Sequence, residues 1–417
     1  MLEPSGVGPD RPVGPDRPAP ARPLYPVSRL HLSAMSDDVG LWQHARGVEP
    51  EPRFGYCTDD VARYIVVDLL QSREVGLAAV DVSIRRSIQF VSDAFDGTSG
   101  RFLNFRTADG RWLEAGASED CQARALAGLA AVVSEMPDTE VAERARQLFA
   151  RALPAADSLG ALRAISAALL ACDLAIDAGF SSAAEPAFEL LAARLAKAFG
   201  LPEIESRPRT HRPERSRHAG LSVLGRSKAG PTGPVEWPWP ESVLTYENAL
   251  VPQALIAAGL RLGRPALLAR GCSVLDWLID VQAGESGQFS PVGTSHWWPR
   301  TAERSRFDQQ PIEAATMLSA AAAAYRATGR ARYLDAAETA YGWFLGDNDL
   351  GVTLADPARG ACYDGLTPTG PNENQGAEST LMWLTALERM RELRRSTKGG
   401  FVLPALAELG PDAAARQ

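Results

Sequence analysis

The 417-residue sequence has none of the short motifs that mark several large enzyme classes. It contains no GxGxxG or GxxxxGK[ST] element and no GxSxG sequence, which argues against nucleotide-dependent transfer and serine hydrolysis. Its five histidines form no HxH or HExxH pattern, and no cysteine pair has metal-ligand spacing. Neither a metal nor another cofactor is therefore expected.

Long apolar runs and an excess of positive charge are also missing. No apolar run reaches the roughly 18 residues of a membrane span, and the N-terminus lacks the basic start and apolar stretch of a signal peptide. The formal charge of −8 argues against a protein that binds nucleic acid by neutralising phosphates. We therefore expect a cytoplasmic protein whose partners include no membrane and no nucleic acid.

Cysteine is scarce and scattered. The chain has five cysteines, an odd number, and they stand far apart at Cys57, Cys121, Cys172, Cys272 and Cys362. This pattern indicates reduced thiols that are mostly buried as small apolar groups.

Aromatic residues are few, at 7%, whereas alanine is abundant. This composition suits closely packed helices better than a β-sandwich, which is richer in aromatic and β-branched residues. Hydrophobic residues make up 45% and charged residues 23%, so the chain can form a large core and is not disordered as a whole.

Three segments interrupt this composition. Residues 1–28 are rich in Pro and Gly, with VGPDRP at 7–12 repeated at 13–18, and are predicted to be disordered. Residues 203–235 are basic and rich in Pro and Gly, which predicts a flexible surface insert or, alternatively, a lid over a site. The stretch 396–417 is predicted to be a loose C-terminal tail. One domain is expected between them, over residues 29–395.

Within that domain the dominant pattern is helical and repeats. Six Ala- and Leu-rich helices are predicted to follow polar clusters near residues 58, 118, 158, 245, 308 and 374. Amphipathic helices with charged faces alternate with them, at 80–95, 139–153, 183–199, 265–281 and 331–345. We interpret this alternation as an all-α (α/α)6 barrel, a six-hairpin toroid. The sixth outer helix is not evident and could come from residues 36–45 or from the C-terminal tail. An open α-solenoid is disfavoured because the repeat lengths vary widely.

Polar and aromatic residues gather at the starts of the predicted inner helices, which point into one funnel in such a barrel. A carboxylate at one helix start is explained by capping, but five clusters that also carry Trp, Tyr, Asn and Gln exceed that need. Aromatic rings stack on sugar rings while acids and amides bind hydroxyls. The predicted substrate-binding residues are His44, Tyr56, Asp120, Trp239, Tyr246, Glu247, Asn248, Trp297, Gln309, Gln310, Glu313, Asp364, Asn374, Gln375 and Glu378.

Two of the clustered acids could serve as general acid and general base of an inverting glycoside hydrolase. Glu241 is predicted to be the acid, because it follows an apolar Trp/Pro loop that favours a protonated carboxyl. Asp308 is predicted to be the base, and Asp59, Asp60 and Glu119 are the competing candidates.

Several blocks carry a family resemblance: GYCTDDVAR, WPWPESVLTYENALVPQAL, RFDQQPIEA and CYDGLTPTGPNENQGAEST. The chain resembles bacterial proteins found beside, or fused to, glycosyltransferases, over roughly residues 29–395. The resemblance implies a six-hairpin, glycosidase-type α/α toroid and a glycosyltransferase as a possible partner. The sequence departs from that family at Ser118–Arg124, where a His and a Gly are expected after the acids. It also departs at Pro240, where an aromatic is usual, and at Glu247, where Asp is usual.

Three other functions remain open. A sugar epimerase or isomerase on the same toroid would favour two histidines on the inner wall, for which only His44 and His296 are candidates. A terpenoid cyclase or prenyltransferase would need a more apolar interior. The third is a non-catalytic module that binds glycans or partners a glycosyltransferase. It would need the same residues as a hydrolase that acts on an oligosaccharide or glycoside.

Overall fold

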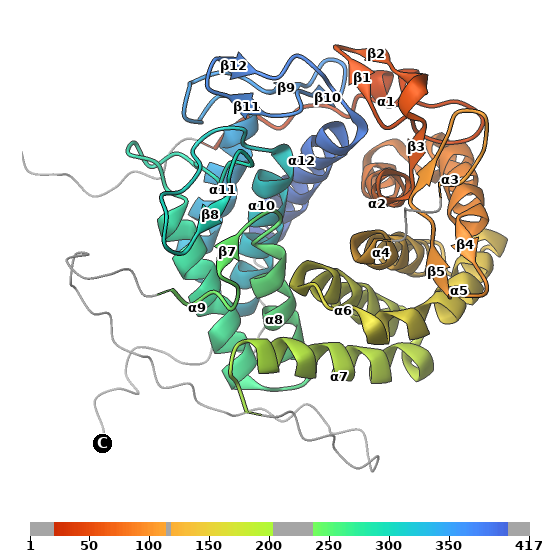
Figure 1. The fold of residues 1–417 in the computed structure, drawn as a ribbon, viewed down its shortest axis with the longest axis horizontal. Coiled ribbons are helices and arrows are strands. Elements are labelled where there is room, and N and C mark those ends of the chain that lie inside the picture. The colour runs from red at the N-terminus through yellow and green to blue at the C-terminus, as the bar shows by residue number, and fades with distance from the viewer. Residues whose placement is uncertain (1–20, 114–117, 203–236, 399–417) are drawn as a thin grey trace, which may run out of the picture.

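The computed structural model describes residues 21–113, 118–202 and 237–398, and within them it has an all-α, six-hairpin toroid fold. Six inner helices stand side by side as a ring in which each contacts the next and the last contacts the first (Figure 1). This arrangement confirms the predicted (α/α)6 fold. The inner helices are α2 (Thr58–Val75), α4 (Glu119–Glu135), α6 (Leu162–Asp177), α8 (Leu250–Arg261), α10 (Pro311–Thr328) and α12 (Ala377–Lys398).

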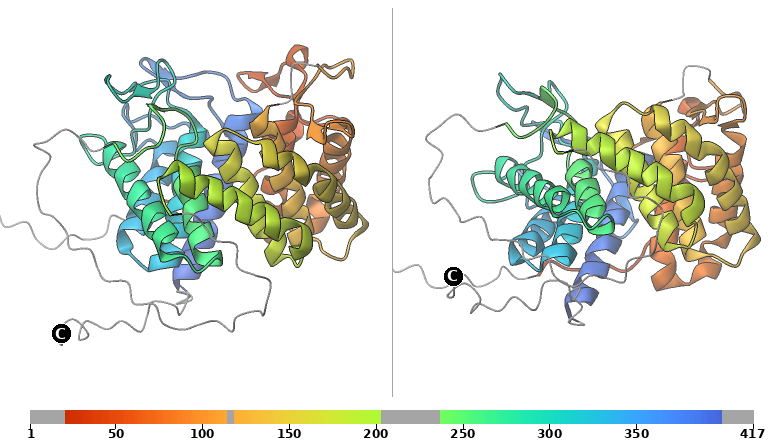
Figure 2. Two further views of the ribbon diagram at one scale, coloured as in Figure 1. Left: turned by 60° about the horizontal axis from the view of Figure 1, so that its bottom comes forward. Right: turned by 90° about the horizontal axis from the view of Figure 1, so that it is seen from below.

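Five outer helices cover the ring, each packed against the inner helix that precedes it in the chain (Figures 1 and 2). Their bounds lie within two residues of the ranges predicted from the sequence. The outer helices are α3 (Asp81–Asp93), α5 (Glu140–Ala152), α7 (Ser181–Ala198), α9 (Pro265–Val281) and α11 (Ala331–Phe344).

The sixth outer position holds an extended segment in the described part of the chain. Residues 36–45, one of the two predicted sources of a sixth helix, form turns, bridges and the start of a short strand, so that prediction was wrong. In the described residues 21–35 that precede them, the five-residue α1 (Leu30–Ala34) is the only helix. The other predicted source, the C-terminal tail, lies outside the described residues beyond Lys398, which ends α12.

Residues 21–29 occupy this position and are held there by contacts with neighbouring helices. Arg394 of α12 donates to the carbonyl of Arg22 (2.6 Å), and Tyr341 of α11 donates to that of Pro23 (3.0 Å). Arg29 then pairs with Asp68 of α2 (2.5 Å). The last eight residues of the predicted disordered segment 1–28 therefore have described contacts, whereas residues 1–20 and the predicted insert at 203–235 lie outside the described residues.

Small side chains allow the inner helices to pack on nearly all sides. Helix α10 buries Ala314, Ala315, Ala320 and Ala321, and it contacts α8, α11 and α12. A helix that is apolar all round is expected to lie inside a core, whereas the outer helices bury one face only. All five cysteines are buried and free, which confirms the prediction of buried thiols.

Short antiparallel strand pairs tie the loops together at one end of the ring (Figure 2). The pair β3–β6 joins the loops before α2 and α4, and β7–β8 joins those before α8 and α10. The pairs are β1 (Ala45–Arg46) with β2 (Glu49–Pro50), β3 (Tyr56–Cys57) with β6 (Phe105–Arg106), β4 (Phe95–Asp96) with β5 (Arg101–Phe102), β7 (Val243–Leu244) with β8 (Trp298–Pro299), β9 (Ala355–Asp356) with β10 (Ala361–Cys362), and β11 (Leu366–Thr367) with β12 (Gly370–Pro371).

Candidate functional site

The sequence-predicted site residues lie at the N-terminal ends of the inner helices or in the loops before them, a region we call the mouth. All six inner helices begin at this end of the ring because each is separated from the next by an outer helix that runs back. The exposed N–H groups and helix dipoles at these six ends favour carboxylates.

Arg124 in the second turn of α4 gathers three of the predicted carboxylates. Its guanidinium lies 2.6 Å from Glu247, 3.6 Å from Asp120 and 3.8 Å from Asp59. These acids come from the loop before α8, from α4 and from α2, so three separate chain segments meet at one cation. Tyr246 donates a hydrogen bond to Asp120 and joins the same group.

Arg63 of α2 connects the first and last inner helices. It lies 2.8 Å from Asp60 in its own helix and 3.0 Å from Glu378 in the first turn of α12. Asp60 is buried, and this burial raises the pKa of its carboxyl to about 7, although Arg63 opposes the shift. The neighbouring carboxylates of Glu378 and Asp59 raise the pKa of Asp60 further.

Arg163 at the start of α6 holds the loop before α8. It donates to Glu241 (2.7 Å), to the carbonyl of Tyr246 (2.7 Å) and to the side chain of Asn248 (3.1 Å). Trp239 is buried and donates to the same Glu241 carboxylate (3.1 Å). The surroundings of Glu241, predicted to be apolar, therefore include the buried guanidinium of Arg163.

Glu313 of α10 also holds the loop before α8 in place. Its carboxylate accepts hydrogen bonds from the backbone N–H of Glu247 and from the side chain of Asn248 (3.4 Å). Burial raises the pKa of Glu313 to about 8. Glu247 has a φ of 50°, a left-handed conformation that costs free energy in a residue other than glycine and needs surrounding contacts to persist.

The structure thus joins nine predicted residues in two sets of ion pairs and hydrogen bonds, seven around Arg124 and Arg163 and two around Arg63. Sequence reasoning missed the three arginines at the centres of these sets. A signal was present, because Asp60 and Arg63 are three residues apart and Asp120 and Arg124 four, spacings that place two side chains on one helix face. The joined residues are Asp59, Asp60, Asp120, Glu241, Tyr246, Glu247, Asn248, Glu313 and Glu378.

Three other predicted residues make contacts of a structural kind. Glu119 accepts hydrogen bonds from the backbone N–H groups of Gly160 and Ala161 (2.8 and 2.7 Å), where it caps the start of α6. Gln309 is buried and accepts from the indole N–H of Trp343 (2.8 Å). Tyr56 is buried, donates to Asp37 (2.6 Å) and stacks on a neighbouring tryptophan.

The loop before α10 brings Trp297 and Asp308 to the rim of the mouth. Both have a left-handed backbone, with φ of 56° and 60°, and the three non-glycine residues with positive φ in the described chain all lie in the mouth loops. Trp297 lies beside Tyr246, with ring centroids 6.2 Å apart, whereas Asp308 accepts a hydrogen bond from Ser295. Gln310 is the N-cap residue of α10.

The remaining predicted residues link residues 44–47 to the start of α12. Asp364 accepts from the backbone N–H of Gly376 (2.7 Å), and burial raises the pKa of its carboxyl, while the nearby His44 opposes this shift. Asn374 accepts from the N–H of Gly47 (3.4 Å), and the buried Gln375 binds His31 through its carbonyl (2.8 Å).

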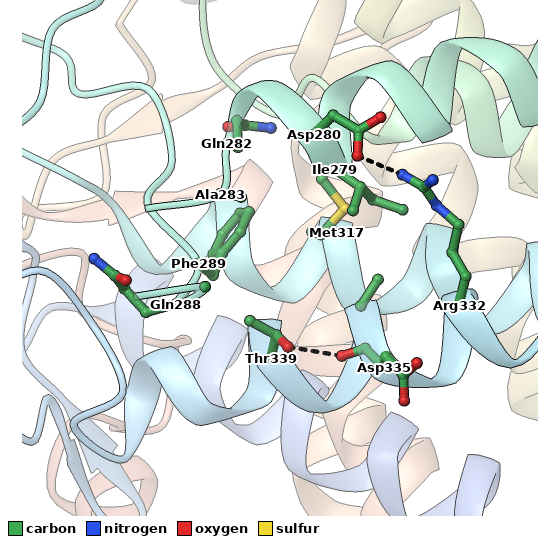
Figure 3. A pocket seen from close by; sticks show the side chains of 12 residues that line it. Ile279, Asp280, Gln282, Ala283, Gln288, Phe289, Met317, Arg332, Asp335 and Thr339 are labelled. Atoms are coloured by element: carbon green, nitrogen blue, oxygen red, sulfur yellow. Dashed lines mark hydrogen bonds and ion pairs between the residues drawn. The ribbon is translucent and has the colours of Figure 1, made fainter. Parts of the chain in front are cut away.

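A separate cavity of about 300 Å³ lies on the outer wall between α9 and α11 (Figure 3). Phe289 and Met317 line it, and Asp280 and Arg332 form an ion pair at its side. None of the sequence-predicted site residues lines this cavity. Across the described ranges no cluster of His, Cys, Asp and Glu suits a metal ion, and no helix there is long and apolar enough to span a membrane.

Comparison with known proteins gives a fold. The sequence matches no family model and no curated protein sequence. The structure is similar to cellobiose 2-epimerase from Spirochaeta thermophila, with a TM-score of 0.60, 16% identity and coverage of 88% of this chain and 93% of that one. It is similar to a D-mannose isomerase, with a TM-score of 0.61, 12% identity and coverage of 87% and 94%. An α-mannanase of glycoside hydrolase family 76 from Bacteroides thetaiotaomicron has a TM-score of 0.54, 9% identity and coverage of 88% and 95%. The chain therefore shares the six-hairpin toroid of these enzymes.

Proposed function

We propose that the protein is a carbohydrate-active enzyme that hydrolyses glycosidic bonds at the mouth, with Asp59 and Glu247 as its two reacting carboxyls. The observation that carries the proposal is their position on either side of Arg124. One comes from α2 and the other from the loop before α8, so a sugar between these elements would meet both.

The spacing of the two carboxyls suits hydrolysis. Arg124 lies 3.8 Å from Asp59 and 2.6 Å from Glu247, through its two terminal nitrogens. The two carboxylate oxygens therefore cannot be more than about 9 Å apart, a bound that admits both the roughly 5–5.5 Å of retaining and the roughly 6.5–9.5 Å of inverting glycosidases.

The surroundings of each carboxyl favour different roles. Glu247 has the closer contact with the Arg124 guanidinium, which fixes the position of its carboxylate, and we assign it as the base that activates water. One oxygen of Asp59 is buried and has no hydrogen-bond partner among the described residues. The other oxygen lies 3.8 Å from Arg124, the longer of the two contacts, and we assign Asp59 as the acid that protonates the leaving oxygen. Glu241 and Asp308, the pair predicted from the sequence, remain the competing assignment.

The test is reducing-sugar release from a panel of glycans by the wild type and amide variants. Asp59→Asn and Glu247→Gln are each expected to lower kcat by about 10²- to 10⁴-fold, because each removes a proton donor or acceptor. Loss of the acid should remove the alkaline limb of the pH profile, and loss of the base the acidic limb. Full activity in both variants, with loss in Glu241→Gln and Asp308→Asn, would restore the sequence-predicted pair.

Epimerisation or isomerisation of a sugar is the second candidate, and similarity to a cellobiose 2-epimerase and a mannose isomerase supports it. Against it, the described part of the inner helices carries no histidine, and His44 and His296 lie in loops. Incubation in deuterium oxide separates the two reactions. An epimerase would place solvent deuterium on carbon 2 of the sugar without releasing a new reducing end, whereas a hydrolase would release one.

A glycosyltransferase partner and a cytoplasmic location remain part of the proposal and rest on the sequence resemblance and composition. Saturable glycan binding with no product from any substrate would favour a non-catalytic partner module over a hydrolase.

A further inference from the structure

We propose that the mouth accepts sugars without anionic groups, namely neutral and amino sugars, and rejects uronic acids and phosphorylated or sulfated sugars. This inference rests on the proposed function, because it concerns the sugar that the same site would hold.

The cations at the starts of the inner helices are already engaged with protein groups. The first two turns of the described inner helices carry three basic residues, which are Arg63, Arg124 and Arg163. Arg63 contacts two carboxylates, Arg124 contacts three, and Arg163 contacts Glu241 and two oxygens of the loop before α8. An anionic sugar would have to displace one of these groups to reach a guanidinium.

In two of these pairs the carboxylate faces solvent much more than the guanidinium does. The side chain of Glu241 is 36% exposed and that of Arg163 is 5% exposed. Glu378 is 40% exposed against 9% for Arg63. At these two pairs the inner-helix ends therefore present negatively charged acceptors to a ligand, while the guanidiniums lie behind them.

This arrangement selects between ligands by charge. Sugar hydroxyls and ammonium groups can donate hydrogen bonds to the carboxylates, and such bonds to ionised acceptors are stronger than neutral ones. An anionic group would instead lie beside like charges, which is costly, or would break an ion pair whose cation is buried.

The first test measures binding by calorimetry to matched oligosaccharides that differ only in carrying glucose, glucosamine or glucuronic acid at one position. The wild type is expected to bind the glucuronic acid member at least about tenfold more weakly than the glucose member. Equal or tighter binding of the glucuronic acid member would overturn the inference.

A gain of binding gives the sharper test. Glu241→Gln and Glu378→Gln each remove the most exposed carboxylate partner of one arginine, and each should shift the glucuronate-to-glucose affinity ratio toward glucuronate by about tenfold. Glu338→Gln is the matched control, because Glu338 pairs with Arg394 on the outer wall (2.7 Å) and should leave the ratio unchanged. An unchanged ratio in both mouth variants would contradict the inference.

The two proposals fail separately. Selective binding of neutral sugars without cleavage would leave the inference standing and overturn hydrolysis. Cleavage of uronate-containing glycans would support hydrolysis and overturn the inference, and no binding of any member would overturn both.

Discussion

Arg124 is the residue on which the mouth depends most, because three carboxylates share its charge. Arg124→Ala would leave Asp59, Asp120 and Glu247 close together without their cation, and leaving buried charges unpaired typically costs about 3–5 kcal/mol. We expect a loss of unfolding free energy of that order in urea denaturation. Arg359→Ala, which removes an exposed pair with Asp356, should leave the midpoint unchanged. Equal effects of the two substitutions would show that the Arg124 cluster has no special stabilising role.

Glu119 allows a helix-capping role to be distinguished from a catalytic role at a single residue. It was a competing catalytic candidate in the sequence, yet in the structure its carboxylate accepts two backbone N–H groups at the start of α6. Glu119→Ala should lower the unfolding free energy by about 1 kcal/mol, the usual cost of losing a cap, while kcat on the best substrate falls less than in Asp59→Asn. A loss of rate as large as that of Asp59→Asn, with unchanged stability, would make Glu119 a reacting group instead.

Glu313 and Asp60 make stability depend on pH. Burial raises their pKa values in the folded protein to about 8 and about 7, so the folded state holds protons that the unfolded state has released. Their contribution is fully present below the ordinary carboxyl pKa and is lost as the pH rises through 7 and 8. The urea midpoint of the wild type should decrease as the pH is raised from 5 to 8.5. The decrease should be shallower in Glu313→Gln. A wild-type midpoint that rises over this interval would contradict the shifts.

At the scale of elements, residues 21–29 replace a sixth outer helix. Arg22, Pro23 and Tyr25 accept hydrogen bonds from α11 and α12 through their carbonyls, so this segment covers part of the wall. A chain that begins at residue 30 should have a lower melting temperature than the full chain. A chain that begins at residue 21 should match the full chain, because residues 1–20 are predicted from their composition to be disordered. Equal melting temperatures for all three chains would show that the segment is dispensable.

The helices themselves could be predicted from the sequence because their signals are local. The Ala-rich periods identified all six inner helices, and four begin within about three residues of the expected cluster. Helix α6 begins at Leu162 instead of near 158, because Leu153–Ser158 forms a 3-10 helix. Helix α8 begins at Leu250, because Arg163 holds the preceding residues in a loop.

There is a physical reason why the extended segment in place of a sixth outer helix could not be predicted. A segment such as 21–29 carries Pro and Arg and has no apolar period, so it reads as unstructured when taken alone. It is ordered by carbonyl groups that accept hydrogen bonds from arginines more than 300 residues away in sequence. Contacts of this kind exist only after the ring has closed.

At the scale of the whole molecule, ring closure decides which polar residues meet. Asp60 and Glu378 stand at opposite ends of the domain sequence and yet share Arg63, because α12 packs against α2. The clustering of polar residues at helix starts was visible in the sequence, but the pairing of each acid with a particular arginine was not. From the sequence alone, an acid that caps a helix cannot be distinguished from one that pairs with a distant arginine. The positions of the six helix ends in space are needed to tell them apart.

The most direct test of the account is a crystal structure of the Glu247→Gln variant with a bound oligosaccharide that the wild type cleaves. The account predicts a sugar at the mouth, with its anomeric carbon between Asp59 and residue 247 and with no anionic group against Glu241 or Glu378. A sugar bound at the mouth but reached by neither Asp59 nor residue 247, or bound instead in the outer-wall cavity between α9 and α11, would contradict it.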